Sequence, residues 1–270
     1  MASNSIETKL DGKSRQEGII ALLDRHSVLT ISALADQFGC TPATIRRDLI
    51  RIAEEGVRLE HYHGSVGLVR EDLGSQFEAQ RISHFEAKEA IAQLLVDFIP
   101  NDMTIGLNGG TTTLLIGRAL AKAHKPVRVV TNAVNIAYEL SMKDMDVVIV
   151  GGAVRRPNFE STGQLALRTL SGMHVDLTIL GAEGVDSQFG FSTTAEDEAA
   201  VARVFRDCSD AIVMAVDKSK LGKKALFRLL GWDDVNYVAV DWVNSALLQY
   251  LADVEVAQKS SAAQVWRTKR

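Results

Sequence analysis

The stretch Thr41-Pro-Ala-Thr-Ile-Arg-Arg-Asp-Leu-Ile-Arg-Ile-Ala-Glu-Glu-Gly56 decides the fold of the N-terminal part of the chain. A threonine followed by a proline is typical of a helix start, because threonine caps free N–H groups and proline fits the first turn. Helical spacing then places three apolar residues on one face, which we expect to be buried: Ile45, Leu49 and Ile52. The stretch therefore predicts an amphipathic helix whose outer face is rich in arginine.

Two further helices are predicted before this one. Residues 14–26 carry four apolar residues at helical spacing, with Ser14 as the expected N-cap and Glu17 as its capping-box partner. Residues 31–38 repeat the helical pattern over a shorter length, and Gly39 ends it. Two helices joined by a tight turn that contains glycine are the helix-turn-helix pattern.

The outer face of the third helix suits a polyanion. In a DNA major groove, residues near the start of such a helix meet base edges, and arginines fork onto guanine or hold phosphates. A solvated arginine face explains the charges equally simply, but the complete three-helix pattern favours DNA binding. The expected DNA-binding residues of this helix are Thr41, Thr44, Arg46, Arg47 and Arg51.

A β-hairpin is predicted directly after the third helix. Residues 57–63 alternate apolar and polar side chains, Gly64-Ser65 makes a turn, and residues 66–69 resume a strand. A hairpin in this position is either a DNA-binding wing or a hinge that packs on the third helix. As a wing, it would bring three further residues to DNA: Arg58, His61 and His63.

The rest of the chain predicts an α/β domain. Short apolar runs alternate with helical patterns; the runs are 103–107, 127–131, 147–150, 177–181, 211–216 and 237–240. This alternation indicates a largely parallel sheet covered by helices. The expected organisation is a disordered leader at 1–13, a winged helix-turn-helix at 14–69, a linker at 70–76, an effector-sensing α/β domain at 77–253 and a flexible tail at 254–270.

Candidate ligand-binding residues follow the predicted strands, because ligands of such sheets bind at the carboxyl ends of the strands. After the first strand, glycines allow close approach to an anion, and threonines and helix-start N–H groups donate hydrogen bonds to it. A glycine turn capped by threonine explains the same residues. We interpret the segment as a phosphate cradle, made of Asn108, Gly109, Gly110, Thr111, Thr112 and Thr113.

Other strand ends add polar groups to the same edge of the sheet. Taken singly, each is explained by an ordinary glycine turn or a solvated charge. Together they bring an amide, carboxylates and cations to one place, which fits a phosphorylated, polyhydroxylated ligand. The further candidates are Asn132, Gly152, Arg155, Glu183, Asp217 and Lys220.

Composition narrows the remaining classes of function. The formal net charge of −4 does not exclude DNA binding, since only the docking face must be basic. No window approaches the roughly 18 apolar residues of a membrane helix, and residues 1–13 lack a secretory signal. We expect a cytoplasmic protein without a membrane partner. Cys40 and Cys208 have neither metal-ligand spacing nor a disulfide framework, so no metal and no cofactor are expected.

Several motifs resemble the DeoR family of bacterial transcription regulators. They are Thr44-Ile-Arg-Arg-Asp-Leu49, Glu55-Gly56, His63-Gly64, Gly110-Thr-Thr-Thr113, Thr131-Asn132, Gly151-Gly152, Gly181-Ala-Glu-Gly184 with Asp186, and Asp217-x-Ser-Lys220. The resemblance implies a sensor domain similar in fold to ribose-phosphate isomerases and CoA transferases, with phosphorylated sugars or sugar alcohols as ligands. This chain departs from the family pattern in its wing, Glu60-His-Tyr-His-Gly-Ser65, and at Asn108 and Glu183, where Asp is usual.

The function hypothesis is a repressor of a carbohydrate or related catabolic operon that a phosphorylated sugar-type effector releases from double-stranded operator DNA. Paired half-sites imply a homodimer or homotetramer. One alternative is an isomerase-like enzyme that uses Glu183, Asp217 or Lys220 as acid and base. An enzyme has no use for residues 14–69, so we expect no catalytic activity. The other alternative, an activator that needs its ligand, is equally compatible with these residues.

Overall fold

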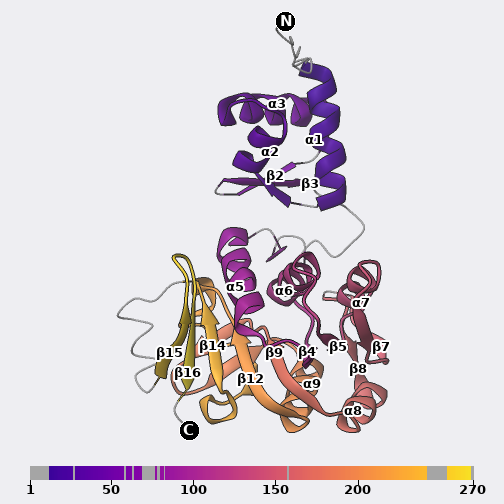
Figure 1. The fold of residues 1–270 in the computed structure, drawn as a ribbon, viewed down its shortest axis with the longest axis vertical. Helices are drawn as coiled ribbons and strands as arrows, with labels where there is room; N and C mark the ends of the chain where they lie inside the picture. Colours follow the sequence, from indigo (N-terminus) through magenta and orange to yellow (C-terminus); the bar gives the residue numbers. More distant parts are fainter. Residues whose placement is uncertain are drawn as a thin grey trace, which may run out of the picture. The chain divides into compact units, whose positions relative to one another are not determined.

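The computed structural model describes residues 12–26, 28–57, 59–62, 64–68, 77, 80–81, 83–156, 158–241 and 254–268. The chain divides into two compact units, Met1–Ser83 and His84–Arg270, and each is described by itself (Figure 1). The predicted linker at 70–76 and residues 1–11 of the predicted leader lie outside the described residues. Among the helices of the described residues, none has the length and apolar character to cross a membrane.

The first unit combines three helices with a small antiparallel sheet, as predicted. Its elements are α1 (Gly12–His26), β1 (Val28–Thr30), α2 (Ile31–Gln37), α3 (Pro42–Glu54), β2 (Leu59–Tyr62) and β3 (Ser65–Leu68), with strand order β1-β3-β2. The predicted cap at Ser14 is wrong, because α1 starts at Gly12 and Ser14 lies in its first turn. The predicted cap at Thr41 is confirmed: its Oγ1 accepts a hydrogen bond from the N–H of Thr44 at 3.3 Å.

The apolar stripes predicted from the sequence form the core of this unit. The side chains that are fully buried are Ile19, Leu23, Leu34, Ile45, Leu49, Ile52 and Val66. Burial of each such side chain contributes about 1.5 to 3 kcal/mol to the free energy of unfolding. Since three of them come from α3, the core fixes the rotation of this helix about its axis and thereby decides which residues face solvent.

A buried carboxylate joins the third helix to the first. Asp48, only 2% exposed, accepts hydrogen bonds from Arg15 Nε at 2.6 Å and Gln16 Nε2 at 3.1 Å. Burial by itself would raise the pKa of Asp48, but the hydrogen bonds and the positive charge of Arg15 outweigh it and hold this pKa below its usual value. The aspartate of the arginine-rich helix is therefore a structural residue.

We expect Asp48→Ala to lower the stability of the first unit by about 2 kcal/mol, because Arg15 and Gln16 lose their acceptor. Arg15 is 16% exposed and regains some hydration, so the expected cost is below that of a fully buried pair. Thermal unfolding of the full chain, with hydrogen exchange read in α1 and α3, measures the effect. Asp36→Ala, an exposed change on α2, is the control. Equal stability of the two variants would contradict a structural role for Asp48.

The second unit is built on an eight-stranded sheet in the order β15-β16-β14-β12-β9-β4-β5-β6. Six of its strands are mutually parallel, which confirms the predicted fold class. These are β4 (Thr104–Leu107), β5 (Arg128–Thr131), β6 (Asp146–Ile149), β9 (Val175–Leu180), β12 (Ser209–Ala215) and β14 (Tyr237–Val240).

The order of the strands creates a switch point between β4 and β9. From β4 the chain runs outward through β5 and β6, whereas from β9 it runs in the opposite direction through β12 and β14. Helices cover both faces: α5 (Phe85–Phe98), α6 (Thr111–Lys122) and α7 (Val134–Ser141) lie on one, α8 (Gly163–Ser171) and α9 (Glu196–Asp207) on the other (Figure 1). Adjacent loops leave such a switch point in opposite directions and open a crevice for ligands at the carboxyl ends of the strands.

Two small sheets follow the carboxyl ends of β6 and β9, and the sequence did not predict them. One is the hairpin of β7 (Ala153–Val154) and β8 (Ser161–Thr162). The other is antiparallel and contains β10 (Gly184–Asp186), β11 (Gly190–Thr193) and β13 (Phe227–Leu230). Strands of two to four residues are too short to show a period-two pattern.

The prediction of a flexible tail at 254–270 is wrong for its described part. Residues 254–268 form β15 (Val254–Lys259) and β16 (Gln264–Thr268), and β16 pairs antiparallel with β14. The strand pairing is stabilised by Val265 and Trp266, which are buried. The polar residues that suggested an irregular tail lie on strands at the edge of the sheet, where one side of the strand remains in water.

Candidate functional site

Within the described part of the chain, the third helix presents two arginines without ionic partners. Arg46 and Arg47 are exposed, and among the described residues neither forms an ion pair. Arg51 is also exposed, but it lies close to the start of α1: its Nη1 is 3.9 Å from the position that a Cβ on Gly12 would occupy. Its positive charge also acts on Asp48 and helps to lower the pKa of that carboxyl group. Arg46 and Arg47 are therefore the side chains of α3 best placed to reach a phosphate or a guanine.

The other predicted DNA-binding residues divide into two groups. Thr41 and Thr44 bond to each other at the start of α3, with 3.0 Å between their hydroxyl oxygens. On the same helix, the apolar side chain of Ile50 is 57% exposed. Arg58 and His63 lie outside the described residues; for His61 only the backbone, in β2, is described.

The candidate ligand site of the second unit lies at the switch point. Asn108, at the end of β4, accepts a hydrogen bond through Oδ1 from the N–H of Gly181, at the end of β9, at 2.9 Å. This bond ties together the two loops that leave the sheet in opposite directions. Asn108 is buried. Its amide, which replaces the usual Asp of the family, makes the hydrogen bond between the two loops without adding a negative charge.

The predicted cradle begins α6. Gly110 is the N-cap with φ +146°, a backbone conformation that favours glycine, and the helix starts at Thr111. The first N–H groups of a helix lack intrahelical acceptors and point toward an anion. The Oγ1 of Thr113 donates to the carbonyl of Gly110 at 3.1 Å, so this hydroxyl stabilises the loop itself. Thr111 and Thr112 are almost fully buried at the helix start.

Neighbouring strand ends contribute amide, glycine and hydroxyl groups. Asn132 is fully buried; its Nδ2 donates to the carbonyl of Ser161 at 3.1 Å, while its Oδ1 has no partner among the described residues. Gly152 has φ +157°, and a Cβ there would stand 2.6 Å from the carbonyl oxygen of Thr162. This glycine lets β7 and β8 close against the end of β6.

A group of charges stands at the end of β12. Asp217 is 1% exposed; its Oδ1 accepts from the N–H of Ser219 at 2.8 Å, and its Oδ2 has no partner among the described residues. Burial lowers the pKa of Lys88 to about 8, a shift that the carboxylate of Asp217 opposes and the charge of Lys220 reinforces. The sequence reasoning missed Lys88 as a ligand candidate, because this residue lies on α5 and follows no strand end.

The structure adds a carboxylate cluster that the sequence did not reveal. Glu160 is 2% exposed, and its Oε1 accepts from the N–H of Gly109 at 2.5 Å. The side-chain amide of Asn158 donates to Glu160 at 2.7 Å and to Glu198 at 2.6 Å. Glu198 also accepts from Arg155 Nη1 and from the hydroxyl of Thr193, both at 2.5 Å. The predicted residue Arg155 is therefore held by a carboxylate of α9.

The surroundings of this cluster raise the pKa values of both of its carboxyl groups. Burial and the neighbouring charge of Glu198 raise the pKa of Glu160 to about 8. Burial likewise raises the pKa of Glu198, although Thr193 and Arg155 act against it. Glu183, another predicted residue, accepts from both the N–H and the hydroxyl of Thr194 at 3.2 Å and adds a like charge near Glu198.

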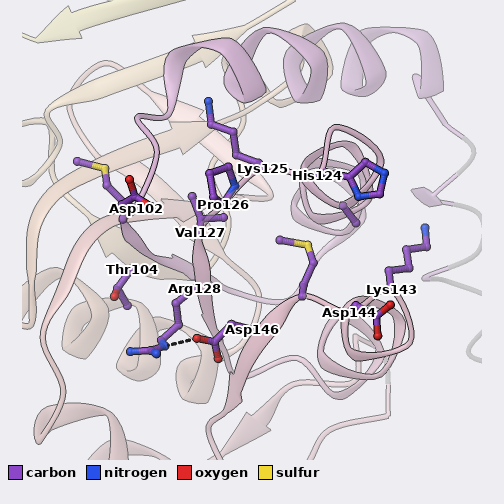
Figure 2. Close-up of a pocket in the computed structure, with 13 residues that line it drawn as sticks. Asp102, Thr104, His124, Lys125, Pro126, Val127, Arg128, Lys143, Asp144 and Asp146 are labelled. Carbon is purple, nitrogen blue, oxygen red and sulfur yellow. Dashed lines mark hydrogen bonds and ion pairs between the residues drawn. The ribbon is translucent and has the colours of Figure 1, made fainter.

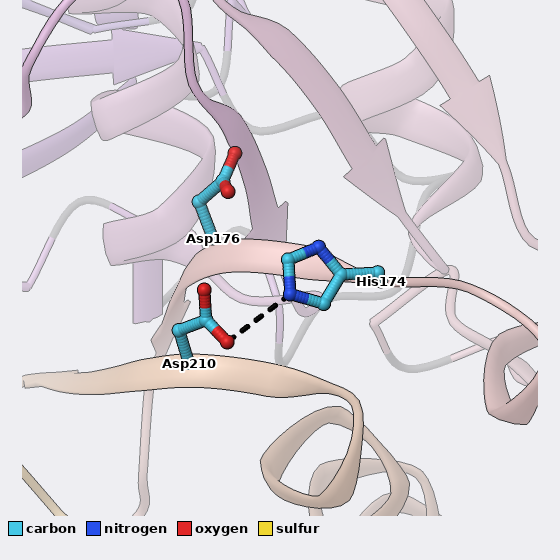
Figure 3. Close-up of side chains that lie close together, drawn as sticks. All are labelled: His174, Asp176 and Asp210. Carbon is cyan, nitrogen blue, oxygen red and sulfur yellow. Dashed lines mark hydrogen bonds and ion pairs between the residues drawn. The ribbon is translucent and has the colours of Figure 1, made fainter.

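The amino ends of the strands, at the opposite edge of the sheet, carry different features. A hollow of about 580 Å³ lies before β4, β5 and β6. Figure 2 shows the residues that line it, among them Arg128 and Asp146, which form an ion pair. The Nε of Arg128 lies 2.7 Å from Oδ2 of Asp146. Figure 3 shows His174, Asp176 and Asp210 close together. Nε2 of His174 lies 3.1 Å from Oδ1 of Asp210, within hydrogen-bonding distance. Asp176 accepts a hydrogen bond from the N–H of Thr104 at 2.7 Å. Both aspartates therefore form hydrogen bonds at the starts of strands.

Family models match both halves of the chain. The DeoR-like helix-turn-helix domain matches residues 15–72, and the DeoR C-terminal sensor domain matches residues 83–242. The chain belongs to the DeoR family. The first model covers the arginine-bearing helix α3, and the second covers the loops that meet at the switch point. The resemblance predicted from the motifs is thereby confirmed.

Curated relatives of this DeoR-family chain include proteins named as repressors. The glycerol-3-phosphate regulon repressor of Escherichia coli (strain K12) is 31% identical over 228 residues, which cover 84% of this chain and 90% of the relative. The putative aga operon transcriptional repressor of Escherichia coli O157:H7 is 27% identical over 239 residues, covering 87% and 88%. Ribose 5-phosphate isomerase A from Neisseria gonorrhoeae aligns with a TM-score of 0.39 and 18% identity, over 68% of this chain and 75% of that chain. So low a score carries no argument about activity.

Proposed function

We propose that this DeoR-family protein is a transcriptional repressor that binds operator DNA through α3 and is released when a phosphorylated sugar or polyol binds at the switch point. The observation that carries the proposal is the bond between Asn108 and Gly181, which places the N–H groups of α6 at the crevice between β4 and β9. Relatives named as repressors of a glycerol-3-phosphate regulon and of the aga operon support the choice of ligand class.

The anion end of the proposed site has the required chemistry. The N–H groups of Thr111, Thr112 and Thr113 start a helix, whose dipole favours a negative charge. The charges of Asp217 and Lys220 both act on Lys88, so the two lysines stand close to one another. A phosphate near Lys88 would favour its charged form and return its pKa toward the usual value.

Release from DNA requires only differential binding. An effector that binds the DNA-incompetent arrangement more tightly lowers operator affinity by the same factor, with a coupling of about 1 to 3 kcal/mol. Two reading heads on a two-fold operator would make the working unit a homodimer or a homotetramer. We propose no catalysis, since the buried carboxylates at this edge already bond to protein donors, Glu160 to Gly109 and Glu198 to Arg155.

Thermal unfolding of the full-length protein with a panel of phosphate esters tests the proposal. The panel contains glycerol 3-phosphate, pentose 5-phosphates and hexose 6-phosphates, each with its unphosphorylated parent. A ligand of the native state raises the melting temperature by mass action. We expect at least one ester, and not its parent, to stabilise the protein and to release it from DNA fragments selected by the protein from a random pool. Stabilisation by parents alone, or by no compound, would overturn the choice of effector.

A further inference from the structure

The carboxylate cluster beside the cradle has more acceptors than donors. With Glu160 protonated, the four carboxyl oxygens of Glu160 and Glu198 still offer about seven acceptor positions, and the described residues supply five hydrogen bonds to them. Next to them, Asn158 has a buried Oδ1 without a partner among the described residues, as has Asn132. Buried acceptors that lack donors are rare in folded proteins and call for a ligand, a water or a proton.

The surplus lies directly beside the proposed phosphate end. Glu160 accepts a hydrogen bond from the N–H of Gly109, the residue before the N-cap of α6. The cluster is therefore bonded directly to the loop that forms the cradle. Glu198 lies in the first turn of α9, and its side chain is 14% exposed; Arg155 is 27% exposed. The side chain of Glu198 is therefore partly accessible to a ligand at the strand ends, whereas Glu160, at 2% exposed, is enclosed.

We propose that Glu198, positioned by Asn158 and Glu160, binds a hydroxyl group of the effector next to its phosphate. The ligand class is thus a phosphorylated polyol or sugar whose carbon beyond the ester bears a hydroxyl. The inference rests on the proposed function and deepens it. One end of the site offers N–H donors for an anion, and the other offers acceptors for O–H groups. A simple anion such as inorganic phosphate can bind to the N–H donors but has no O–H groups placed to reach the acceptors at the other end.

Charge explains why a hydroxyl suits this position better than a second anionic group. Glu198 faces the carboxylates of Glu160 and Glu183, and Arg155 is the cation that contacts it. An ester that brought another negative charge here would add to this repulsion, whereas an O–H group donates to the carboxylate and adds no charge.

The test compares esters that differ only in hydroxyl groups. Titration calorimetry measures the affinities of glycerol 3-phosphate against n-propyl phosphate, and of sorbitol 6-phosphate against n-hexyl phosphate, for the full-length protein. Glu198→Gln should weaken the preferred polyol ester by about tenfold or more, since a hydrogen bond to a charged acceptor is lost. The matching alkyl ester should bind equally well or more tightly, because a negative charge near the phosphate is removed. A merely structural defect would weaken both esters.

Glu196→Gln is the matched control, because Glu196 lies exposed in the same first turn of α9. It should leave the ratio of the two affinities unchanged. If Glu198→Gln lowers both affinities alike, or leaves the ratio as in the original chain, Glu198 does not bind the hydroxyl. If the original chain binds neither inorganic phosphate nor any of the four esters, the proposed function fails, and this inference fails with it. Preference for a polyol ester that survives in Glu198→Gln overturns this inference alone.

Discussion

A Gly109→Ala variant is expected to lose effector binding by about a hundredfold or more while it still binds DNA. A Cβ at this position would stand 2.2 Å from Cγ and 2.7 Å from Cδ of Glu160. Contacts that short do not occur, so the loop and the carboxylate must move apart. The 2.5 Å bond from Gly109 to Glu160 is then lost, and the start of α6 shifts away from the position in which its N–H groups meet the phosphate.

The measurement for Gly109→Ala is the affinity for whichever ester stabilises the original protein, together with the concentration of that ester that releases DNA. A shift of the cradle by even 1 Å removes well-aligned hydrogen bonds, each worth about 1.5 to 3 kcal/mol when one partner is charged. Gly172→Ala is the control, since the contacts of its added Cβ, at 3.7 Å or more, are ordinary. A Gly109→Ala protein that responds to the ester at the original concentration would show that this loop does not bind the effector.

The sequence predicted those parts of the fold whose signals are local. The cap at Thr41 and the spacing of Ile45, Leu49 and Ile52 define α3 within a dozen residues. The strand ends were also predictable, because a buried parallel strand is a continuous apolar run and its end is marked by glycine. Hence the loops after β4, β5, β9 and β12 could be predicted as candidate ligand-binding segments from the positions of the strand ends, and their binding role stays a prediction.

The missed residues depend on contacts between distant segments. Glu160 reaches Gly109 across 51 positions, and Asn158 reaches Glu198 across 40. Glu160 directly precedes the two-residue strand β8, and its segment has no periodic pattern that would place it in the site. In the sequence, Glu198 is one of three acidic residues at a helix start, where acidic residues are common because of the helix dipole. Only the packing distinguishes it from Glu196.

The contacts of Asn108 and Glu183 explain what these two departures from the family pattern do in the structure. Asn108 bonds Gly181 through an oxygen that Asp would also supply, but the amide brings no negative charge into a crevice that already holds Glu160. Glu183 reaches Thr194 with both oxygens. Both replacements thus keep a hydrogen bond across the site.

Replacing both Arg46 and Arg47 by alanine is expected to lower DNA affinity by about a hundredfold or more without changing effector affinity. Both side chains are exposed on α3 and, within the described residues, neither has an ionic partner that a mutation would disturb. Loss of a base-reading arginine costs about 1 to 3 kcal/mol, and loss of a phosphate contact reduces the dependence of binding on salt.

Binding isotherms at several salt concentrations, on DNA selected from a random pool, separate these two roles for Arg47→Ala alone. A smaller salt slope with unchanged sequence preference assigns Arg47 to phosphate, and relaxed preference at one base pair assigns it to a base. Arg168→Ala, an exposed arginine of α8, is the control for charge.

The reciprocal variant, Thr112→Ala with Lys220→Ala, should lose effector affinity and keep DNA affinity. Equal loss of both functions in either variant would contradict the division of the protein into a reading unit and a sensing unit, because each unit has its own apolar core and none of the four substituted residues belongs to either core.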